Sequence, residues 1–244
     1  MLLGLVGSEM CIRDSVILTG HTHDAIPKAI RINETLLLSS GSHGKYLGRI
    51  DLKVDNGKVV ETSSNLIPIF SDVIPPDKEI SNLINKVRLP FEKECNRVIG
   101  ETETLLYRRG NFNGSWDDVI CDTIIQERDT EISLSPGFRW GTSILPGQKI
   151  TIDDIYSQTA MNYPEVYRTE MTGKMIKEIL EDVCDNIFNP DPFFQQGGDM
   201  VRVGGLTYTC SPKNKIGKRI SNLRMVSKDK PLEASKKYIV GGWG

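Results

Sequence analysis

The chain has 244 residues, with 30 Lys and Arg against 32 Asp and Glu, and a formal net charge of -2. Its 39% hydrophobic and 25% charged residues are ordinary for a globular domain. This balance argues against a nucleic-acid partner, and no apolar stretch is long enough to span a membrane. The five cysteines form no C-x-x-C pair and leave the redox compartment open.

The first fifteen residues, "MLLGLVGSEMCIRDS", start like a signal peptide, but they lack a basic region and their apolar run is too short. The string "LVGSEMCIRDS" looks like translated adapter sequence at the end of a reading frame assembled from environmental reads. We therefore expect residues 1–15 to be a sequencing artefact and Val16 to begin a truncated gene product.

Residues 16–75 are expected to be rich in β-strand, with a hairpin turn at Asn56-Gly57. Near their start, "LTGHTHDAIP" places His21 and His23 two residues apart after an apolar run. Alternate residues of an extended segment project to the same side, so both imidazoles could face one point and bind a metal or an oxyanion. The alternative is that they are partly exposed polar residues at the end of a strand.

Residues 76–97 are predicted to form a linker helix, because Ile80, Leu83, Ile84 and Val87 follow helical spacing and Pro90 marks a kink or stop. The remainder, residues 98–244, reads as mixed α and β. We expect helices capped by Ser115, Thr151 and Thr172. The last of these carries an apolar stripe of Met175, Ile176, Ile179, Leu180, Val183 and Ile187. Cys184 is expected to be a small core residue on this helix.

Three further stretches combine glycine with polar or charged residues. "SSGSHGKYLG" contains the third histidine, His43, and "LSPGFRWGTS" contains Arg139. An arginine in that setting can offer a planar fork to a phosphate, sulfonate or carboxylate, although a surface salt bridge is the alternative. "FNPDPFFQQGGDMVRVGG" brings Asp199 and Arg202 close to aromatic and amide side chains.

In this order, the motifs resemble the 5'-nucleotidase superfamily, which joins a dinuclear metallophosphoesterase domain to a C-terminal substrate-binding domain. Within it, "NPDPFFQQGGDMVRVGGLTYTC" and "IGKRISNL" look most like the SoxB family of thiosulfohydrolases. The resemblance covers nearly all of residues 16–244. It implies a mixed α+β fold: the C-terminal strands of a metallophosphoesterase β-sandwich, a linker helix, and a 5'-nucleotidase C-terminal-type α/β domain.

The resemblance also implies a function. His21 and His23 would each bind one ion of a metal pair, usually described as manganese, although histidine and carboxylate ligands suit several divalent metals. Arg139 would face the sulfonate of the substrate. We also expect Asp199 and Arg202 to bind substrate. The reaction implied is release of sulfate from a cysteine S-thiosulfonate on a sulfur-carrier protein, in the periplasm.

In the superfamily, the remaining metal ligands lie upstream of the position that corresponds to Val16. We therefore expect this chain alone to bind metal poorly and to be inactive. His43 is expected to close a turn; the alternative is that it donates a hydrogen bond to a metal ligand from behind the metal site. Two other functions stay open. One is a nucleotide phosphohydrolase that clamps a base between aromatic rings, with Phe193 and Phe194 as candidates. The other is a non-catalytic module that binds the carrier.

Overall fold

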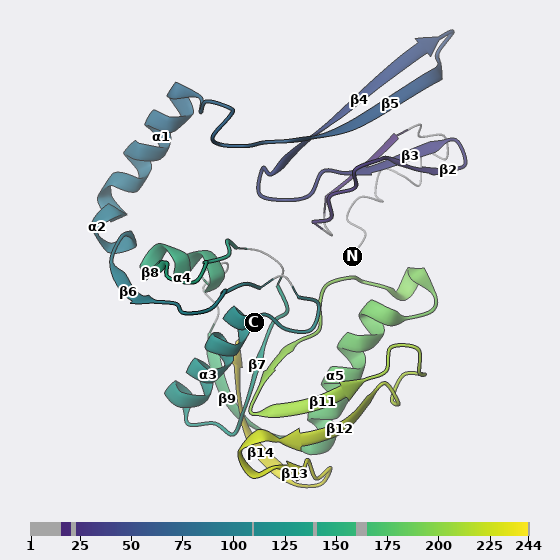
Figure 1. Cartoon of the computed structure of the whole chain (residues 1–244). Helices are drawn as coiled ribbons and strands as arrows, with labels where there is room; N and C mark the ends of the chain where they lie inside the picture. The colour runs from purple at the N-terminus through teal and green to yellow at the C-terminus, as the bar shows by residue number, and fades with distance from the viewer. Residues whose placement is uncertain (1–15, 21–22, 109, 139–140, 160–164, 244) are drawn as a thin grey trace. The chain divides into compact units, whose positions relative to one another are not determined.

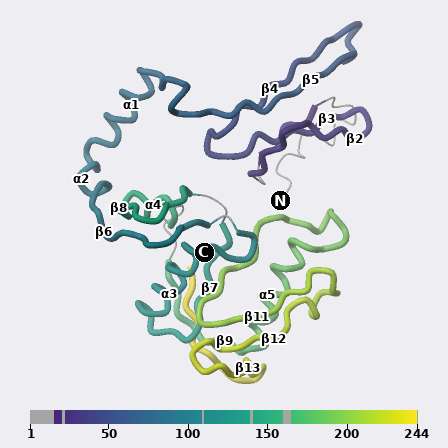
Figure 2. The backbone as a smooth tube through the Cα atoms, viewed as in Figure 1, coloured from purple at the N-terminus to yellow at the C-terminus, as the bar shows by residue number. Residues whose placement is uncertain are grey.

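The computed structural model describes residues 16–20, 23–108, 110–138, 141–159 and 165–243. The chain forms two compact units, Met1–Leu89 and Pro90–Gly244 (Figures 1 and 2). Within the described part of the chain, every helix is too short or too polar to cross a membrane.

The N-terminal unit contains a small sheet and a long hairpin. The sheet has the order β1-β3-β2, from β1 (Val16–Thr19), β2 (Ile30–Ile32) and β3 (Thr35–Ser39). β1 and β3 run parallel, whereas β2 and β3 are antiparallel. Leu36 and Leu38 of β3 are buried, as expected for the central strand.

The hairpin pairs β4 (Tyr46–Asp55) with β5 (Lys58–Pro68) through a two-residue turn (Figure 1). Asn56 and Gly57 both have positive φ, 48° and 74°, as a primed turn requires. The predicted turn at Asn56-Gly57 is therefore confirmed.

The helix predicted over residues 76–97 is present but interrupted, and its role as a linker stays a prediction. α1 (Lys78–Arg88) begins at Asp77, whose carboxylate accepts from the backbone N–H of Ile80 at 2.9 Å. A 3-10 turn, η1 (Leu89–Phe91), and a short helix, α2 (Glu92–Cys95), follow, so the helix stops at Pro90 as predicted. The apolar stripe of α1 is about half exposed and none of its residues is buried.

The C-terminal unit is built on a four-stranded sheet with the order β10-β7-β14-β9. Its strands are β7 (Ile132–Ser135), β9 (Val166–Thr172), β10 (Arg202–Gly204) and β14 (Lys237–Trp243). All four residues of β7 are buried, because this strand lies between β10 and β14 and beneath α3 (Ser115–Arg128).

A second sheet, β11-β12-β13, packs with the long helix α5 (Gly173–Phe188) (Figure 1). It contains β11 (Leu206–Cys210), β12 (Ile220–Met225) and β13 (Lys230–Pro231), with the 3-10 turn η3 (Val226–Lys228) before the last. The main core includes Ile176, Leu180 and Cys184 of α5 together with Val240 of β14. A two-stranded sheet of β6 (Val98–Glu101) and β8 (Lys149–Thr151) leads into α4 (Ile152–Thr159).

Two of the three predicted helix caps are confirmed. The Thr172 hydroxyl accepts from the N–H of Met175 at 3.2 Å, and Thr151 and Asp154 cap α4 reciprocally. The cap predicted at Ser115 is wrong, because Gly114 is the capping residue. The Ser115 hydroxyl instead donates to the carbonyl of Leu105 and accepts from the N–H of Tyr107.

The apolar stripe predicted on α5 is mostly correct. Ile176 and Leu180 are fully buried, and Cys184 is buried with them as expected. Met175 is the exception, since it lies in the first turn and is 46% exposed.

Candidate functional site

The histidine loop follows β1 in the N-terminal unit. His21 lies outside the described residues, so the predicted pairing of His21 with His23 stays a prediction. At His23 the backbone turns through a φ of 60°, and its N–H donates to the carbonyl of Gly20 at 3.1 Å. The neighbouring Asp24 carbonyl accepts from the hydroxyl of the buried Ser39 at 2.6 Å, which ties this loop to the end of β3.

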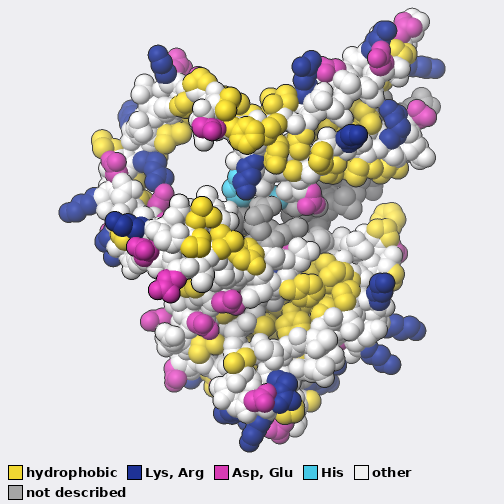
Figure 3. Space-filling view, in the orientation of Figure 1, with side chains coloured by type: hydrophobic (Ala, Val, Ile, Leu, Met, Phe, Trp, Pro, Cys, Tyr) yellow, Lys and Arg dark blue, Asp and Glu magenta, His cyan; other side chains and the backbone are white. Residues whose placement is uncertain are grey.

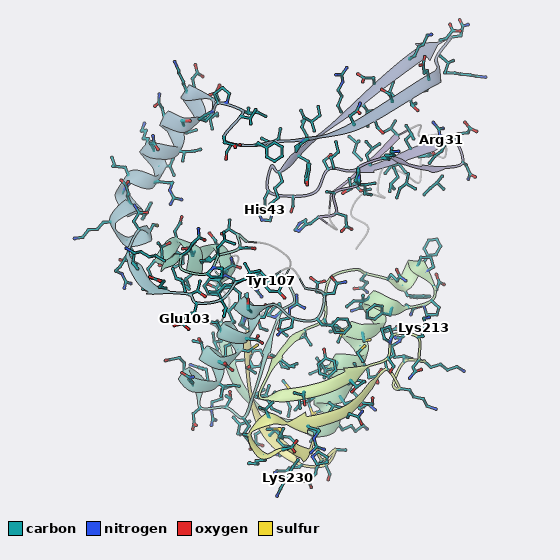
Figure 4. The ribbon with its side chains drawn as sticks, viewed as in Figure 1. Arg31, His43, Glu103, Tyr107, Lys213 and Lys230 are labelled. Atoms are coloured by element: carbon teal, nitrogen blue, oxygen red, sulfur yellow. The ribbon has the colours of Figure 1, made fainter. Side chains whose placement is uncertain are left out.

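His43 lies beside His23, on the loop after β3. Because β1 and β3 are parallel with Thr19 opposite Ser39, the loops that follow them lie at the same edge of the sheet. The two imidazole rings are edge-to-face, with centroids 6.2 Å apart. His43 also closes a turn, with a φ of 60° and a hydrogen bond between its Nδ1 and the Ser42 hydroxyl (Figure 4 labels this residue).

The described residues do not complete a two-metal centre. A dinuclear centre needs several histidine and carboxylate ligands around each ion. Among the described residues, no group of three or more His, Cys, Asp and Glu side chains could hold a metal ion. Two neighbouring imidazoles without a carboxylate do not fit the pair of metal ions that the resemblance implies.

A buried ion-pair cluster lies in the C-terminal unit. The Nε of Arg108 donates to Oδ1 of Asp117 at 2.7 Å, and both side chains are fully buried. The Nε of Arg202 lies 3.1 Å from the other carboxylate oxygen of Asp117. Burial raises the pKa of Asp117, and the two guanidinium groups oppose this effect. One carboxylate thus bridges two buried arginines that come from β10 and from the segment before α3.

Arg202 and Asp199, which the sequence predicted to bind substrate, belong to this cluster. Arg202 has no exposed side-chain surface and lies 3.7 Å from Asp199. Its guanidinium also donates to the carbonyls of Gly110 and Met200 at 2.5 and 3.3 Å. Burial lowers the pKa of Arg202. With its side chain buried among protein acceptors, Arg202 supports neighbouring loops here, and direct contact with a substrate stays a prediction.

The loop between β7 and Ile144 carries the predicted anion-binding Arg139, which lies outside the described residues. The flanks of this loop are held by buried groups. Arg108 donates to the carbonyl of Pro136 at 3.1 Å and to that of Gln158 at 2.7 Å. The Gln158 amide in turn donates to the carbonyl of Thr142 at 3.0 Å. The arginine and the glutamine therefore fix both ends of the segment that includes Arg139.

The same loop packs against the stretch that contains Asp199. A Cβ on Gly137 would lie 2.3 Å from the carbonyl oxygen of Met200, so only glycine permits this approach of two backbones. The N–H of Met200 donates to the carbonyl of Asn111 at 3.0 Å. Two motifs that are about sixty residues apart in the sequence thus meet beside the ion-pair cluster.

The C-terminal unit also carries exposed aromatic side chains. The rings of Phe112 and Phe188 are stacked, with centroids 6.2 Å apart, and Phe112 is 40% exposed. Phe193 and Phe194, on the 3-10 turn η2 (Pro192–Phe194), are 86% and 64% exposed. The carboxylate of Asp191 holds this turn by accepting from the N–H of Phe193 at 3.0 Å.

A groove of about 840 Å³ lies between the C-terminal end of α5 and the loop at residues 211–219. Glu181 fixes that loop, because its buried carboxylate accepts from the N–H groups of Gly217, Arg219 and Ile220. Arg219 also pairs with Asp185 at 2.5 Å. Lysine side chains gather at the exposed edge of this loop (Figure 3), and Lys213 is labelled in Figure 4.

Sequence reasoning missed Arg108 and Asp117 and placed His43 outside the site. Asp117 stands in the first turn of a predicted helix, a position typical of exposed acidic residues that stabilise the helix end. Its partners are 9 and 85 residues away, so the sequence carries no local signal for the cluster. His43 was detectable from its glycine-rich turn, but its nearness to His23 depends on the parallel pairing of β1 and β3.

The fold of this site is that of a known family of hydrolases. Residues 98–243 match the 5'-nucleotidase, C-terminal domain family, and the chain belongs to that family. The mixed α+β fold predicted from the sequence is confirmed.

Individual proteins extend the comparison beyond the family domain. Sulfate thiohydrolase SoxB of Thermus thermophilus is 32% identical, with a TM-score of 0.90 over 98% of this chain and 45% of its own. A 5'-nucleotidase precursor of Thermus thermophilus has the same fold at 20% identity, with a TM-score of 0.77 over 94% of this chain and 49% of its own. The trifunctional nucleotide phosphoesterase YfkN of Bacillus subtilis is 26% identical over 230 residues, 87% of this chain and 15% of YfkN. The chain thus spans half or less of each of these relatives.

Proposed function

We propose that this chain is part of an enzyme that releases sulfate from a cysteine S-thiosulfonate on a sulfur-carrier protein. The observation that carries the proposal is the likeness to sulfate thiohydrolase SoxB, at 32% identity and a TM-score of 0.90 over nearly the whole chain. The stretch "NPDPFFQQGGDMVRVGGLTYTC" supports the same choice within the superfamily.

The proposed reaction is a hydrolysis. Water attacks the sulfonate sulfur, the S–S bond breaks, and the carrier keeps a cysteine persulfide while sulfate and a proton leave. Arg139 would present its guanidinium to the sulfonate oxygens, since a planar fork suits such an anion. The Arg108, Asp117 and Gln158 contacts support this role because they fix both ends of the loop that carries Arg139.

In the whole enzyme we expect residues 16–75 to belong to the metallophosphoesterase domain, residues 76–97 to link the domains and residues 98–244 to bind substrate. Two divalent metal ions, manganese by resemblance, and a periplasmic location remain part of the proposal. Because the described residues do not complete a two-metal centre, we propose that this chain alone is inactive.

A nucleotide phosphoesterase is the second candidate. The likeness to YfkN favours it, as does the partly exposed Phe112 ring, which could stack on a base. The two candidates differ in the leaving group and in the anion that Arg139 would face. A phosphate ester of a nucleoside would need an aromatic clamp, whereas a carrier cysteine would need room for a peptide arm.

The test is to assay the whole enzyme, loaded with manganese, on both substrates. We expect sulfate release from a carrier protein that bears a cysteine S-thiosulfonate, and phosphate release from AMP at least a hundredfold slower in kcat/KM. Comparable or faster hydrolysis of AMP would overturn the proposal in favour of the nucleotide phosphoesterase.

A further inference from the structure

Two cysteines of the C-terminal unit lie side by side although they are 26 positions apart in the sequence. The Sγ atoms of Cys184, on α5, and Cys210, at the end of β11, are 3.5 Å apart. Cys184 is fully buried and Cys210 is partly exposed. No other pair of sulfurs among the described cysteines makes a contact of this kind.

We propose that Cys184 and Cys210 form a disulfide under oxidising conditions and thereby join α5 to β11. A disulfide bond is about 2.05 Å long, so the two sulfurs need to approach by roughly 1.5 Å. Rotation about the side-chain bonds of two cysteines can supply a movement of this size.

A small disulfide such as oxidised glutathione is a sufficient oxidant. The partly exposed Cys210 attacks one glutathione sulfur as its thiolate and releases one reduced glutathione. Cys184 then loses its proton to solvent base, attacks the Cys210 sulfur and releases the second glutathione. Two protein thiols are oxidised to one disulfide, and one glutathione disulfide is reduced to two thiols.

The second step should depend strongly on pH. Burial and the neighbouring Cys210 raise the pKa of Cys184 to about 12, so its thiolate is scarce near neutrality. Cross-link formation should therefore be several-fold faster at pH 8.5 than at pH 7. The exchange at Cys210 precedes it and leaves a transient mixed disulfide.

The disulfide would stabilise the loop that borders the groove. Cys210 directly precedes Ser211, whose N–H donates to the carbonyl of Arg219 at 2.8 Å. Cys184 lies on α5 between Glu181 and Asp185, which hold the same loop through Gly217 and Arg219. A covalent link at this point would therefore fix both ends of residues 211–219 to α5.

The experiment treats the full chain with oxidised glutathione at pH 8.5, followed by acid quenching, peptide mapping without reductant and a thermal melt. We expect a linked pair of peptides that contain Cys184 and Cys210, with a mass lower by two hydrogens than their sum. The melting temperature should rise by about 5–10 °C and return on reduction.

Cys95→Ser is the matched control, since Cys95 is partly exposed and lies on α2, away from the pair in sequence. It should keep the cross-link and the thermal shift, whereas Cys210→Ser and Cys184→Ala should lose both. The proposal is overturned if oxidation yields only glutathione adducts without the linked peptides. It is overturned equally if the linked peptides form without a thermal shift.

Discussion

Arg108 donates its Nε–H to Asp117 over 2.7 Å at a place where neither side chain reaches solvent. The same carboxylate lies 3.1 Å from Arg202, and Arg108 also donates to the carbonyls of Pro136 and Gln158. The carboxylate of Asp117 therefore contacts two buried arginines, and Arg202 also lies 3.7 Å from Asp199. Arg108 in addition holds Pro136, at the start of the loop that includes Arg139. Arg108 thus connects the ion-pair cluster of this unit to its candidate anion-binding loop.

Removing the carboxylate should be strongly destabilising. Asp117→Ala removes the ion pair of Arg108 and the shorter ion pair of Arg202, both buried, so we expect the free energy of unfolding to fall by about 3–5 kcal/mol. Chemical denaturation of the full chain measures this change. Asp122→Asn, an exposed residue of the same helix, is the control and should change stability by no more than about 0.5 kcal/mol. Equal effects of the two substitutions would contradict the role given to Asp117.

The buried carboxylate of Glu181 provides a second test. It accepts three backbone N–H groups, from Gly217, Arg219 and Ile220. Glu181→Gln replaces one accepting oxygen with an NH2 group that faces donors, which should cost about 1–3 kcal/mol. Hydrogen exchange should also become faster at residues 217–220.

Glu178→Gln is the matched control on the same helix. Glu178 pairs with Lys174 at 3.6 Å on the surface, where its side chain is 61% exposed. A loss of about 0.5 kcal/mol or less is expected there. If Glu178→Gln lowered the free energy of unfolding as much as Glu181→Gln, the role given to Glu181 in holding this loop would be wrong.

Asp185 should contribute to acid sensitivity. The hydrogen bond from Arg219 holds its pKa below the ordinary value of about 3.9, so the unfolded chain binds more protons than the folded chain in acid. The stability that this pair contributes is fully present above about pH 4 and is lost as the pH falls toward the lower, folded pKa. Melting temperatures between pH 5 and pH 2.5 should therefore drop more steeply for the wild type than for Asp185→Asn. Parallel curves for the two proteins would rule out this contribution.

Manganese should have little effect on this chain. The described residues bring His23 and His43 together without a carboxylate, and none of their groups of acidic, His and Cys side chains could hold an ion. We expect 1 mM manganese to shift the melting temperature by less than about 1 °C. A shift of several degrees that disappears in His23→Ala would show that the chain does bind the metal.

Local features were the part of this structure that sequence could predict. The Asn56-Gly57 turn, the stop at Pro90, the caps at Thr151 and Thr172 and the buried Cys184 all follow from backbone preference or helical spacing. The helix cap predicted at Ser115 was wrong because the Ser115 hydroxyl forms hydrogen bonds with Leu105 and Tyr107. Sequence spacing does not reveal these partners.

The candidate site was only partly predictable for the same physical reason. The Asp117 cluster and the His23–His43 pair join residues that are distant in sequence, and their geometry depends on how the strands pair. Asp199 and Arg202 were noticed because of their glycine-rich context, but sequence did not reveal that both side chains are buried. Arg139 and His21 lie outside the described residues, so their predicted roles rest on resemblance.

The most direct test of the proposed function is to compare two ligands on the full chain by calorimetry. The account predicts that a short peptide bearing a cysteine S-thiosulfonate binds at least tenfold more tightly than AMP. Arg139→Ala should remove most of that affinity, while Arg139→Lys should keep part of it. Tighter binding of AMP, or peptide binding unchanged by Arg139→Ala, would contradict the assignment of this domain to a carrier-bound sulfonate.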